Sequence, residues 1–411
     1  MSLTVRALNG DTSFLLTFAP SSAPPARDGR GASSSFPGSF TILIDPWLYE
    51  AGPAKILSPR FSVASLPPVR IGSANGTTPP TAGDGRANGA GAGNARDPSV
   101  LTSLADLPPG VPDLVLISQD KPDHCHLNTL RTLPRATDAL ILAAPAAARK
   151  IRRMRHFAPS VRVLPLPAYD ASAAVVAIDI PPPTPSSPAS APGQVTVARI
   201  RQPRDVAGVH DALAITYRAP TTVLSLRPAG EAHDHDHDLS TARPPISAPL
   251  PIAPSPSSPL SPSSSSPSPT TPHEPTLSVL YAPHGIHAAL LRPYLSAHLV
   301  PRRGALPLTC LLHSFDEVRN PWWMGGAIAH GAPGGAAVVR LCGARAWLAA
   351  HDAVKRLAGL GVARTVVTRW GVQDVRRALR DGAAADAPAA GTGETEVVSL
   401  EVGEEFTVSV V

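Results

Sequence analysis

The chain has 411 residues, including 49 prolines, 31 glycines and only three cysteines, and 36 basic against 31 acidic residues give a formal charge of +5. The basic residues are scattered rather than gathered into a stripe with interleaved aromatic residues, which argues against nucleic-acid binding. Three cysteines do not make a disulfide framework. The N-terminus lacks a secretory pattern, and no apolar run reaches the roughly 18 residues of a membrane helix, so we expect a cytoplasmic protein.

Segments with strand or helix patterns alternate with segments too rich in Pro, Gly, Ser and Ala to enter a core. The first two apolar segments, residues 3–18 and 39–48, are predicted to be strands. Further strands are predicted at 114–117, 139–144, 161–166, 174–180, 194–202, 212–219, 276–285, 308–314 and 346–352. Helices are predicted from near Leu127, at 145–157, at 335–344 and from near Ala353.

Five segments are predicted to be disordered or flexible, at about 19–39, 72–99, 182–193, 228–276 and 381–394. The largest contains His233, His235 and His237 alternating with aspartates. We expect a solvated loop there rather than a metal store, because a disordered segment has no scaffold to fix ligand geometry. The whole chain, residues 1–411, is predicted to be a single domain that is interrupted by these insertions.

The order of the predicted elements indicates the fold class. Two β-rich halves each finish in alternating strands and helices, with polar clusters at the strand ends. Such a pattern indicates an α/β protein in which two sheets pack face to face and helices cover their outer faces.

A polar cluster follows the apolar strand Leu114–Ile117. Residues 118–126, SQDKPDHCH, contain two aspartates, a lysine, two histidines and a cysteine. The carboxyl ends of buried strands are where α/β proteins place their chemistry. Composition alone leaves three interpretations of the cluster: a metal site, the remnant of one, or a polar loop.

The register of this cluster resembles the metallo-β-lactamase superfamily, and specifically its UlaG-like and phospholipase-D-like hydrolases. The signature of that family is a strand followed by Thr-His-x-His-x-Asp-His, and residues 118–124 occupy the same register. FTILIDPWL resembles the family's early strand with a supporting aspartate, SVLYAPHGI its aspartate-bearing strand end, and AWLAAHD the late strand ending in the last histidine ligand. The resemblance implies a four-layer αββα sandwich.

The resemblance also implies a ligand set for one divalent metal. Asp123, His124 and His351 match three ligands of the second metal position, while His284, or alternatively Pro283, replaces the usual bridging aspartate. Gln119 and Lys121 stand where the family has its first two histidines, so the first metal position is modified. Gln202, Asp205 and His210 are the alternatives for the family's next histidine. A carboxylate with imidazoles suits zinc, with iron, manganese or nickel as alternatives.

The function implied by the resemblance is hydrolysis at this modified, mononuclear site. A metal-bound hydroxide would attack an ester, lactone or phosphodiester of a small molecule. Lys121 or His284 would stabilise the developing charge, unless Lys121 instead pairs with Asp120 or Asp123. The alternative is a catalytically inactive member that uses the fold for binding or as a scaffold. A nucleic-acid-processing enzyme is disfavoured by the scattered basic residues.

Several further residues are predicted to support the site. Asp45 is expected to orient a histidine, His126 to cap a helix or hold a ligand, and Cys125 to be a buried, unreactive thiol. The glycine- and tryptophan-containing segment 313–335 is predicted to form a functional loop. Its pocket-wall candidates, together with one residue beside the last histidine, are His313, Asp316, Arg319, Trp322, Trp323 and Asp352. Arg319 could hold a phosphate or carboxylate; alternatively, the tryptophans form an aromatic plug.

Overall fold

The computed structural model describes residues 1–20, 38–48, 101, 103–107, 110–170, 175–182, 190–222, 275–353, 364–383 and 394–410. All of them belong to one compact unit, residues 1–222 and 274–411. The central parts of the five segments predicted to be disordered or flexible lie outside the described residues.

The first sheet has seven strands in the order β19-β1-β2-β3-β4-β5-β6. Strands β19, β1, β2 and β3 are antiparallel neighbours, and β3, β4, β5 and β6 are parallel. Their bounds are β1 Ser2–Ala7, β2 Phe14–Ala19, β3 Phe40–Ile44, β4 Leu114–Ile117, β5 Leu140–Ala143, β6 Val163–Pro165 and β19 Glu405–Ser409. Both β3 and β4 are buried throughout, as expected of strands covered on two faces.

The second sheet also has seven strands, in the order β18-β16-β13-β12-β10-β9-β7. It repeats the pattern of the first sheet: β7, β9, β10 and β12 are antiparallel, and β12, β13, β16 and β18 are parallel. Their bounds are β7 Val176–Ile180, β9 Gly193–Ile200, β10 Ala212–Arg218, β12 Thr276–Ala282, β13 Leu308–His313, β16 Ala344–Ala349 and β18 Glu396–Val398.

Three apolar clusters hold these layers together. The largest lies between the sheets and joins side chains such as Leu3 and Ile42 of the first sheet to Ile215 and Val279 of the second. A second cluster packs Ile151 and its helix neighbours onto the outer face of the first sheet. A third packs the segment 288–299 and a long helix onto the outer face of the second sheet. The four-layer αββα sandwich predicted from the sequence is therefore confirmed.

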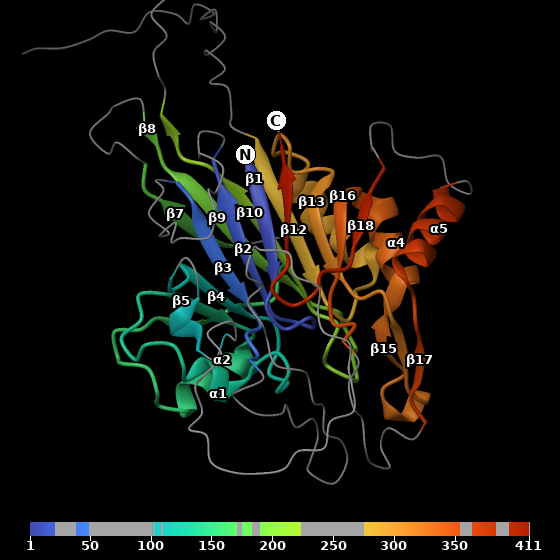
Figure 1. Ribbon diagram of the computed structural model, residues 1–411, viewed down its shortest axis with the longest axis horizontal. Helices are drawn as coiled ribbons and strands as arrows, with labels where there is room; N and C mark the ends of the chain where they lie inside the picture. The colour runs from blue at the N-terminus through green and yellow to red at the C-terminus, as the bar shows by residue number, and fades with distance from the viewer. Residues whose placement is uncertain are drawn as a thin grey trace, which may run out of the picture. The chain divides into compact units, whose positions relative to one another are not determined.

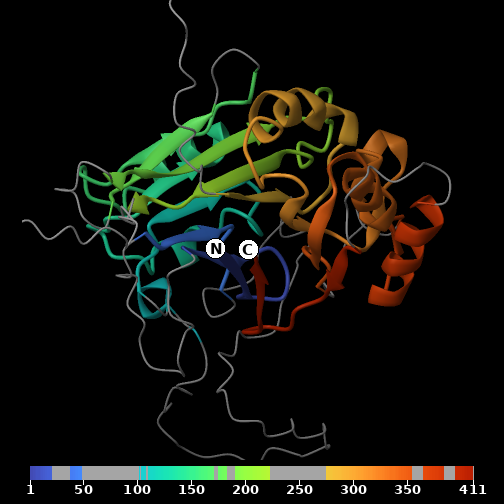
Figure 2. The same ribbon diagram turned by 90° about the horizontal axis from the view of Figure 1, so that it is seen from above.

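The helices lie outside the two sheets (Figures 1 and 2). On the first sheet they are α1 Leu127–Leu130 and α2 Pro145–Arg153. The second sheet is covered by η3 Ala288–Leu291, α3 Arg292–Tyr294, η4 Leu295–Leu299, α4 Gly331–Cys342 and α5 Val372–Ala383. No described helix has both the length and the apolar character needed to cross a membrane.

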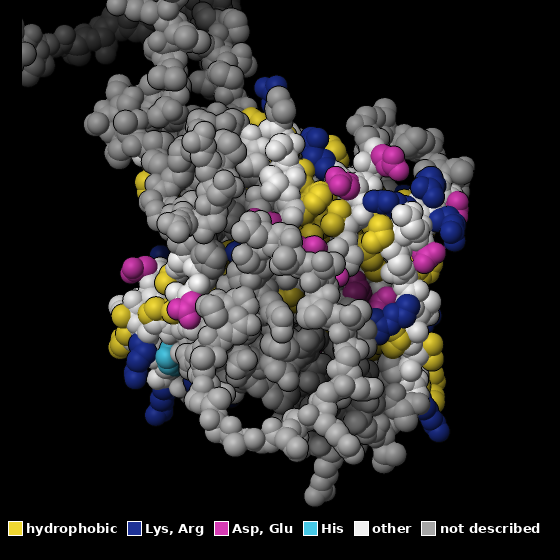
Figure 3. All heavy atoms as spheres, viewed as in Figure 1, with side chains coloured by type: hydrophobic (Ala, Val, Ile, Leu, Met, Phe, Trp, Pro, Cys, Tyr) yellow, Lys and Arg dark blue, Asp and Glu magenta, His cyan; other side chains and the backbone are white. Residues whose placement is uncertain are grey.

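The remaining elements are short. They are η2 Leu104–Asp106, the pair β8 Ser190–Ala191 and β11 Thr221–Thr222, η5 Trp322–Met324, and the three-stranded sheet of β14 Glu317–Arg319, β15 Ala327–His330 and β17 Val366–Thr368. The face of the molecule in Figure 3 carries its Lys and Arg side chains in separate groups with Asp and Glu among them.

One predicted element differs from the structure. Residues 3–18, predicted as one strand, form the antiparallel pair β1 and β2, because Asn9-Gly10 starts a tight turn in which Gly10 has a φ of +65°. The helix predicted to start near Ala353 stays a prediction, because the described residues stop at Ala353 and resume at Arg364; the last described helix is α5.

Candidate metal centre

The candidate site lies where strands of both sheets end. Asp45 follows β3, residues 118–124 follow β4, His284 lies two residues after β12, and His351 lies two residues after β16. Each of these strands has a parallel neighbour, so their carboxyl ends lie at the same edge of their sheet. Segments far apart in the sequence are thereby brought to one place.

Three histidines converge at this edge. His124, His284 and His351 each offer a ring nitrogen, and these atoms lie within 4.8 Å of one another. The Nε2 atoms of His124 and His284 are 3.1 Å apart. His124 and His284 are buried, and His351 is partly exposed. Among the described residues, no other group of three or more His, Cys, Asp or Glu residues meets this criterion.

Each of the three rings is held through its Nδ1 atom. Nδ1 of His124 lies 2.7 Å from Oδ2 of Asp45, Nδ1 of His284 lies 3.0 Å from the carbonyl of Ile328, and Nδ1 of His351 lies 3.2 Å from Oδ2 of Asp11. A ring that donates a proton from Nδ1 to an oxygen keeps a lone pair on Nε2 when it is neutral. The three Nε2 atoms are therefore arranged as metal-binding nitrogens, with the supporting contacts common around ligated histidines.

Asp45 accepts several hydrogen bonds besides the contact with His124. Besides His124, its carboxylate accepts hydrogen bonds from the backbone N–H of Ser118 at 2.7 Å, the Ser118 hydroxyl at 2.5 Å and the Tyr281 hydroxyl at 2.8 Å. Burial, and then the negative charge of Asp45, raise the pKa of Tyr281 well above its ordinary value, so the phenol remains a donor. The sequence predicted that Asp45 contacts a histidine, and that contact is with His124.

Asp123 lies beside two of the three histidines. Its Oδ2 atom is 3.9 Å from Nε2 of His124 and 3.9 Å from Nε2 of His351, and its side chain is 5% exposed. Its backbone carbonyl accepts a hydrogen bond from the Thr12 hydroxyl at 2.8 Å, which ties the turn after β4 to the loop between β1 and β2. The carboxylate therefore stands beside two of the three nitrogens.

This donor set fits a divalent metal ion. Zinc binds imidazole nitrogen at about 2.0–2.1 Å, so two nitrogens on one tetrahedral ion are roughly 3.3 Å apart. The observed 3.1 Å between Nε2 of His124 and Nε2 of His284 is close to that value. Two lone pairs at this distance repel unless a proton or cation lies between them. Three imidazoles and one carboxylate are ligands that zinc, iron and manganese share.

The other residues predicted after β4 have distinct environments. The carbonyl of Lys121 accepts from the backbone N–H of His124 and Cys125, but its ammonium makes no hydrogen bond or ion pair with the described residues, so neither predicted pairing is present there. Burial raises the pKa of the Cys125 thiol to about 12, which makes it unreactive. His126 is the N-cap of α1, with Nδ1 2.9 Å from the Thr129 hydroxyl.

The segment after β13 places the two tryptophans on the surface. Trp322 is 83% and Trp323 58% exposed, with their rings edge to face at 5.9 Å, so they form neither a buried pocket wall nor a plug. Arg319 is also exposed and pairs with Glu317. Its guanidinium therefore already has a carboxylate partner.

The other pocket-wall candidates from this region contact groups within the fold. Asp316 pairs with Arg369 and accepts from the backbone N–H of Trp370 at 3.1 Å. Asp352 accepts from the backbone N–H groups of Phe315 and Asp316, while burial raises its pKa to about 8. His313 is fully buried beside Trp347, whose indole N–H donates to the His313 carbonyl.

A second group of histidine rings adjoins the three-histidine centre. The ring of His210 stacks on that of His330 at 4.7 Å and lies 6.5 Å from that of His284. Oδ1 of Asp205 lies 3.0 Å from Nδ1 of His210. Of the three alternatives for the family's next histidine, His210 is therefore near the centre, although it is not one of the converging group.

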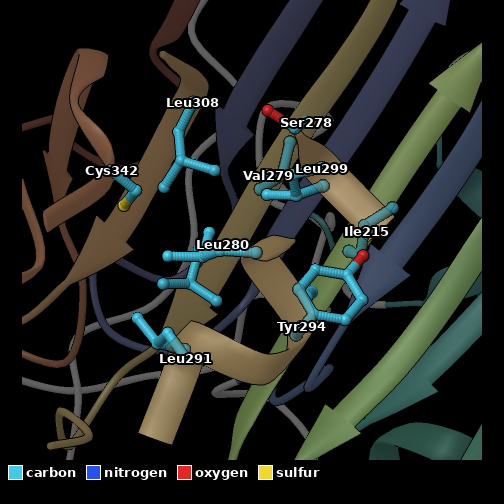
Figure 4. Close-up of a pocket in the computed structure, with 11 residues that line it drawn as sticks. Ile215, Ser278, Val279, Leu280, Leu291, Tyr294, Leu299, Leu308 and Cys342 are labelled. Atoms are coloured by element: carbon cyan, nitrogen blue, oxygen red, sulfur yellow. The ribbon is translucent and has the colours of Figure 1, made fainter. Parts of the chain in front are cut away.

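Two cavities are lined in part by the segment that follows β12, residues 287–299. An open groove of about 670 Å³ is lined by Gln202, Pro203, Arg204 and residues 287–290, and the His287 ring is 5.1 Å from that of His330. The other is an enclosed, almost wholly apolar void of about 10 Å³ under the segment 288–299 (Figure 4). It has room for roughly one water molecule, so we interpret it as a packing defect.

Sequence reasoning missed three groups that position the ligands. Asp11 lies in the turn between β1 and β2, and aspartate is common in turns, so its presence there does not indicate a supporting role. Tyr281 lies within the apolar sequence of β12, where nothing indicates that its hydroxyl contacts Asp45. The carbonyl of Ile328 has no sequence signal, because every residue carries one.

The stability of the protein is expected to fall between pH 7 and pH 5, in part through His313. Burial lowers the pKa of His313 from 6.5 to about 4, against a hydrogen bond to the Ser314 carbonyl that raises it. The His313 ring therefore takes up a proton near pH 6.5 in the unfolded chain but only near pH 4 in the folded chain. Because the unfolded chain binds more protons between these values, the free energy of unfolding falls as the pH falls through this window. The contribution at pH 5 is roughly 2 kcal/mol.

Urea unfolding of the wild type and of His313→Asn at pH 7 and pH 5 measures this effect. Asparagine removes the titrating ring and keeps a donor for the Ser314 carbonyl. We expect the difference in unfolding free energy between the two pH values to shrink by about 2 kcal/mol in the variant. An unchanged difference would mean that His313 is already protonated, or exposed, in the folded protein.

Comparison with known proteins gives only distant similarity. No family model matches the chain, and no curated protein matches it. Similar solved structures include Igni18, a metallo hydrolase from Ignicoccus hospitalis (TM-score 0.42, 11% identity, 100% of both chains covered), and an isothiocyanate hydrolase from Delia radicum gut bacteria (TM-score 0.42, 12% identity, 99% of this chain and 98% of that one). CmlA, a diiron β-hydroxylase from Streptomyces venezuelae, matches with a TM-score of 0.39 and 11% identity, over 100% of this chain and 54% of its own. Similarity at this level assigns neither a reaction nor a ligand to this chain.

Proposed function

We propose that this protein is a metal-dependent hydrolase of the metallo-β-lactamase fold, related to the UlaG-like branch. One divalent ion, with zinc, iron and manganese as the candidates, would be held by His124, His284, His351 and Asp123. The observation that carries the proposal is the convergence of three imidazoles within 4.8 Å, each with its Nδ1 atom held by an oxygen of a different segment.

The chain's own residues contribute orientation and charge. When bound, the ion would lower the pKa of a water molecule toward 7 and polarise a substrate oxygen. Asp45, Asp11 and the Ile328 carbonyl fix the ring orientations before the ion arrives. Asp123 adds a negative charge that offsets part of the ion's charge. Burial of His124 and His284 keeps bulk water from competing at those nitrogens.

The substrate is proposed to be a small ester, lactone or phosphodiester that approaches from the side of His351. Among the three converging histidines, His351 has the most exposed side chain, at 10%. Arg319 is not proposed to hold a phosphate, since it is exposed and paired with Glu317. The three cysteines are buried free thiols, which supports the reducing, cytoplasmic setting expected from the sequence.

Hydrolysis assays on the metal-loaded full chain test this function. 4-Nitrophenyl acetate, an acyl-homoserine lactone and bis(4-nitrophenyl) phosphate represent the three bond types. We expect at least one to be hydrolysed by the wild type and none by the double variant His124→Ala, His351→Ala. If the wild type holds an ion but hydrolyses no member of broad ester, lactone and phosphodiester collections, the catalytic proposal fails, and the fold serves binding or scaffolding.

A further inference from the structure

Gln119 lies beside the three-histidine centre and is 94% buried, since its exposed fraction is 6%. Its Nε2 atom is 3.1 Å from Nε2 of His124. Because Nδ1 of His124 donates to Asp45, Nε2 of the neutral ring is an acceptor, and the Gln119 amide is the donor. The amide therefore occupies the lone pair that a metal ion would need.

The other end of the same amide has no partner among the described residues. Within the described part of the chain, Oε1 of Gln119 is buried and accepts no hydrogen bond. A buried amide oxygen without a hydrogen bond has lost the water that it bound in the unfolded chain and gained nothing in return, so it destabilises the folded protein. A side chain that is well bonded at its nitrogen and unsatisfied at its oxygen fits the protein poorly in the absence of a ligand.

We propose that binding of the ion turns the Gln119 amide over, so that Oε1 becomes a further ligand. This inference rests on the proposed function and adds a residue to its site. Once the ion takes the lone pair of His124, the amide N–H faces a cation and loses its acceptor. Rotation by about 180° about the last side-chain torsion exchanges nitrogen and oxygen in nearly the same space. The oxygen then gains a cationic partner in place of none.

The distances permit this ligand. After the rotation Oε1 occupies the place of Nε2, which is 3.1 Å from Nε2 of His124. Two ligand atoms at about 2.1 Å from one ion are roughly 3.0 Å apart at a right angle and about 3.4 Å apart at a tetrahedral angle. The separation between Gln119 and His124 falls in this range.

A glutamine ligand changes which metal the site prefers. With Asp123 and Gln119 the site offers three nitrogens and two oxygens, one of them an amide carbonyl. Carbonyl and carboxylate oxygens and more than four ligands suit manganese and iron(II) better than a four-coordinate zinc. The substitution Gln119→Leu should therefore shift the preference of the site toward zinc.

Metal titration of the full-length chain tests the ligand directly. Mn²⁺ and Zn²⁺ dissociation constants are measured for the wild type, Gln119→Leu, Gln119→Glu and Gln202→Leu. Gln202 is the matched control, because its Oε1 accepts from the His287 backbone N–H in the adjoining groove. The double variant His124→Ala, His351→Ala reports ions bound elsewhere, including by His233, His235 and His237.

The direction of the change in metal affinity shows whether Gln119 is a metal ligand or only a hydrogen-bond donor to His124. As a ligand, its replacement by leucine should weaken Mn²⁺ binding about 10- to 100-fold and Zn²⁺ binding less, while glutamate retains the affinity. If the amide stays a donor to His124, it competes with the ion, and Gln119→Leu binds as well as or better than the wild type. That result would overturn the inference while leaving the proposed function intact. Absence of any ion lost in the double histidine variant would overturn both.

An independent readout does not depend on affinity. In protein labelled with ¹⁵N- and ¹³C-glutamine, the Gln119 side-chain signals are identified by their loss in Gln119→Leu. Adding one equivalent of Zn²⁺ should move the Gln119 amide carbonyl and N–H signals and leave those of Gln194 unchanged. Unmoved Gln119 signals with the ion bound would contradict the rotation, whatever the affinities are.

Discussion

Replacing His284 by alanine is expected to raise the dissociation constant for the divalent ion more than 100-fold and to abolish hydrolysis. His284 supplies one of the three converging nitrogens, and its Nδ1 atom is already held by the Ile328 carbonyl. Losing even a residue that only supports a ligand costs about 10- to 100-fold in affinity, so losing a ligand costs more. Metal-buffered titration and the hydrolysis assay measure the two effects.

His287→Ala is the matched control for this variant. It lies three residues further along the same loop, its side chain is exposed, and it is not part of the converging group. We expect its ion affinity to stay within about 2-fold of the wild type. Equal losses in both variants would point to a general disturbance of the loop rather than to a missing ligand.

Asp45→Asn is expected to weaken both the fold and the site. The carboxylate accepts from Ser118, His124 and Tyr281, and all of these groups are buried. An asparagine keeps one acceptor oxygen but turns an NH₂ group toward the remaining donors, each of which costs about 1–3 kcal/mol when unsatisfied. We expect a loss of about 2–4 kcal/mol in the free energy of unfolding. Ion affinity should fall about 10- to 100-fold, because His124 loses its orientation.

Asp113→Asn separates these two effects. Asp113 accepts hydrogen bonds from the backbone and hydroxyl of Thr41 at 2.7 and 2.8 Å, at the opposite end of β4 from the metal centre. It should lower stability in urea unfolding and leave the ion affinity unchanged. If Asp45→Asn behaved in the same way, Asp45 would be a structural residue only.

The layered fold could be predicted because its signals are local. Apolar runs such as Leu114–Ile117 and Leu308–Leu312 form strands that are buried on both faces, and the low-complexity insertions separate cleanly from them. The bounds of the helices and strands were predicted less accurately. The helix α4 begins at Gly331 rather than Gly335, because its first turn includes Pro333 and Gly334, residues that read as a loop.

The candidate metal centre was predicted only through its register after β4 and its two distant histidines. His124, His284 and His351 are brought together by three strands from both sheets, and pairing over such distances has no local signal. The role of Gln119 also could not be predicted from the sequence alone. Its position suggested a lost ligand, whereas the burial of its side-chain oxygen, without a partner among the described residues, is visible only in the folded structure.

The most direct measurement of the central claim is the metal content of the full-length protein, purified without an affinity tag or chelating column. Mass spectrometry would compare the wild type with the double variant His124→Ala, His351→Ala, each refilled with zinc, iron or manganese and then dialysed. The proposed centre predicts one more tightly bound ion per chain in the wild type than in the variant. Equal metal content in the two proteins would contradict it and leave the converging histidines without a metal to hold.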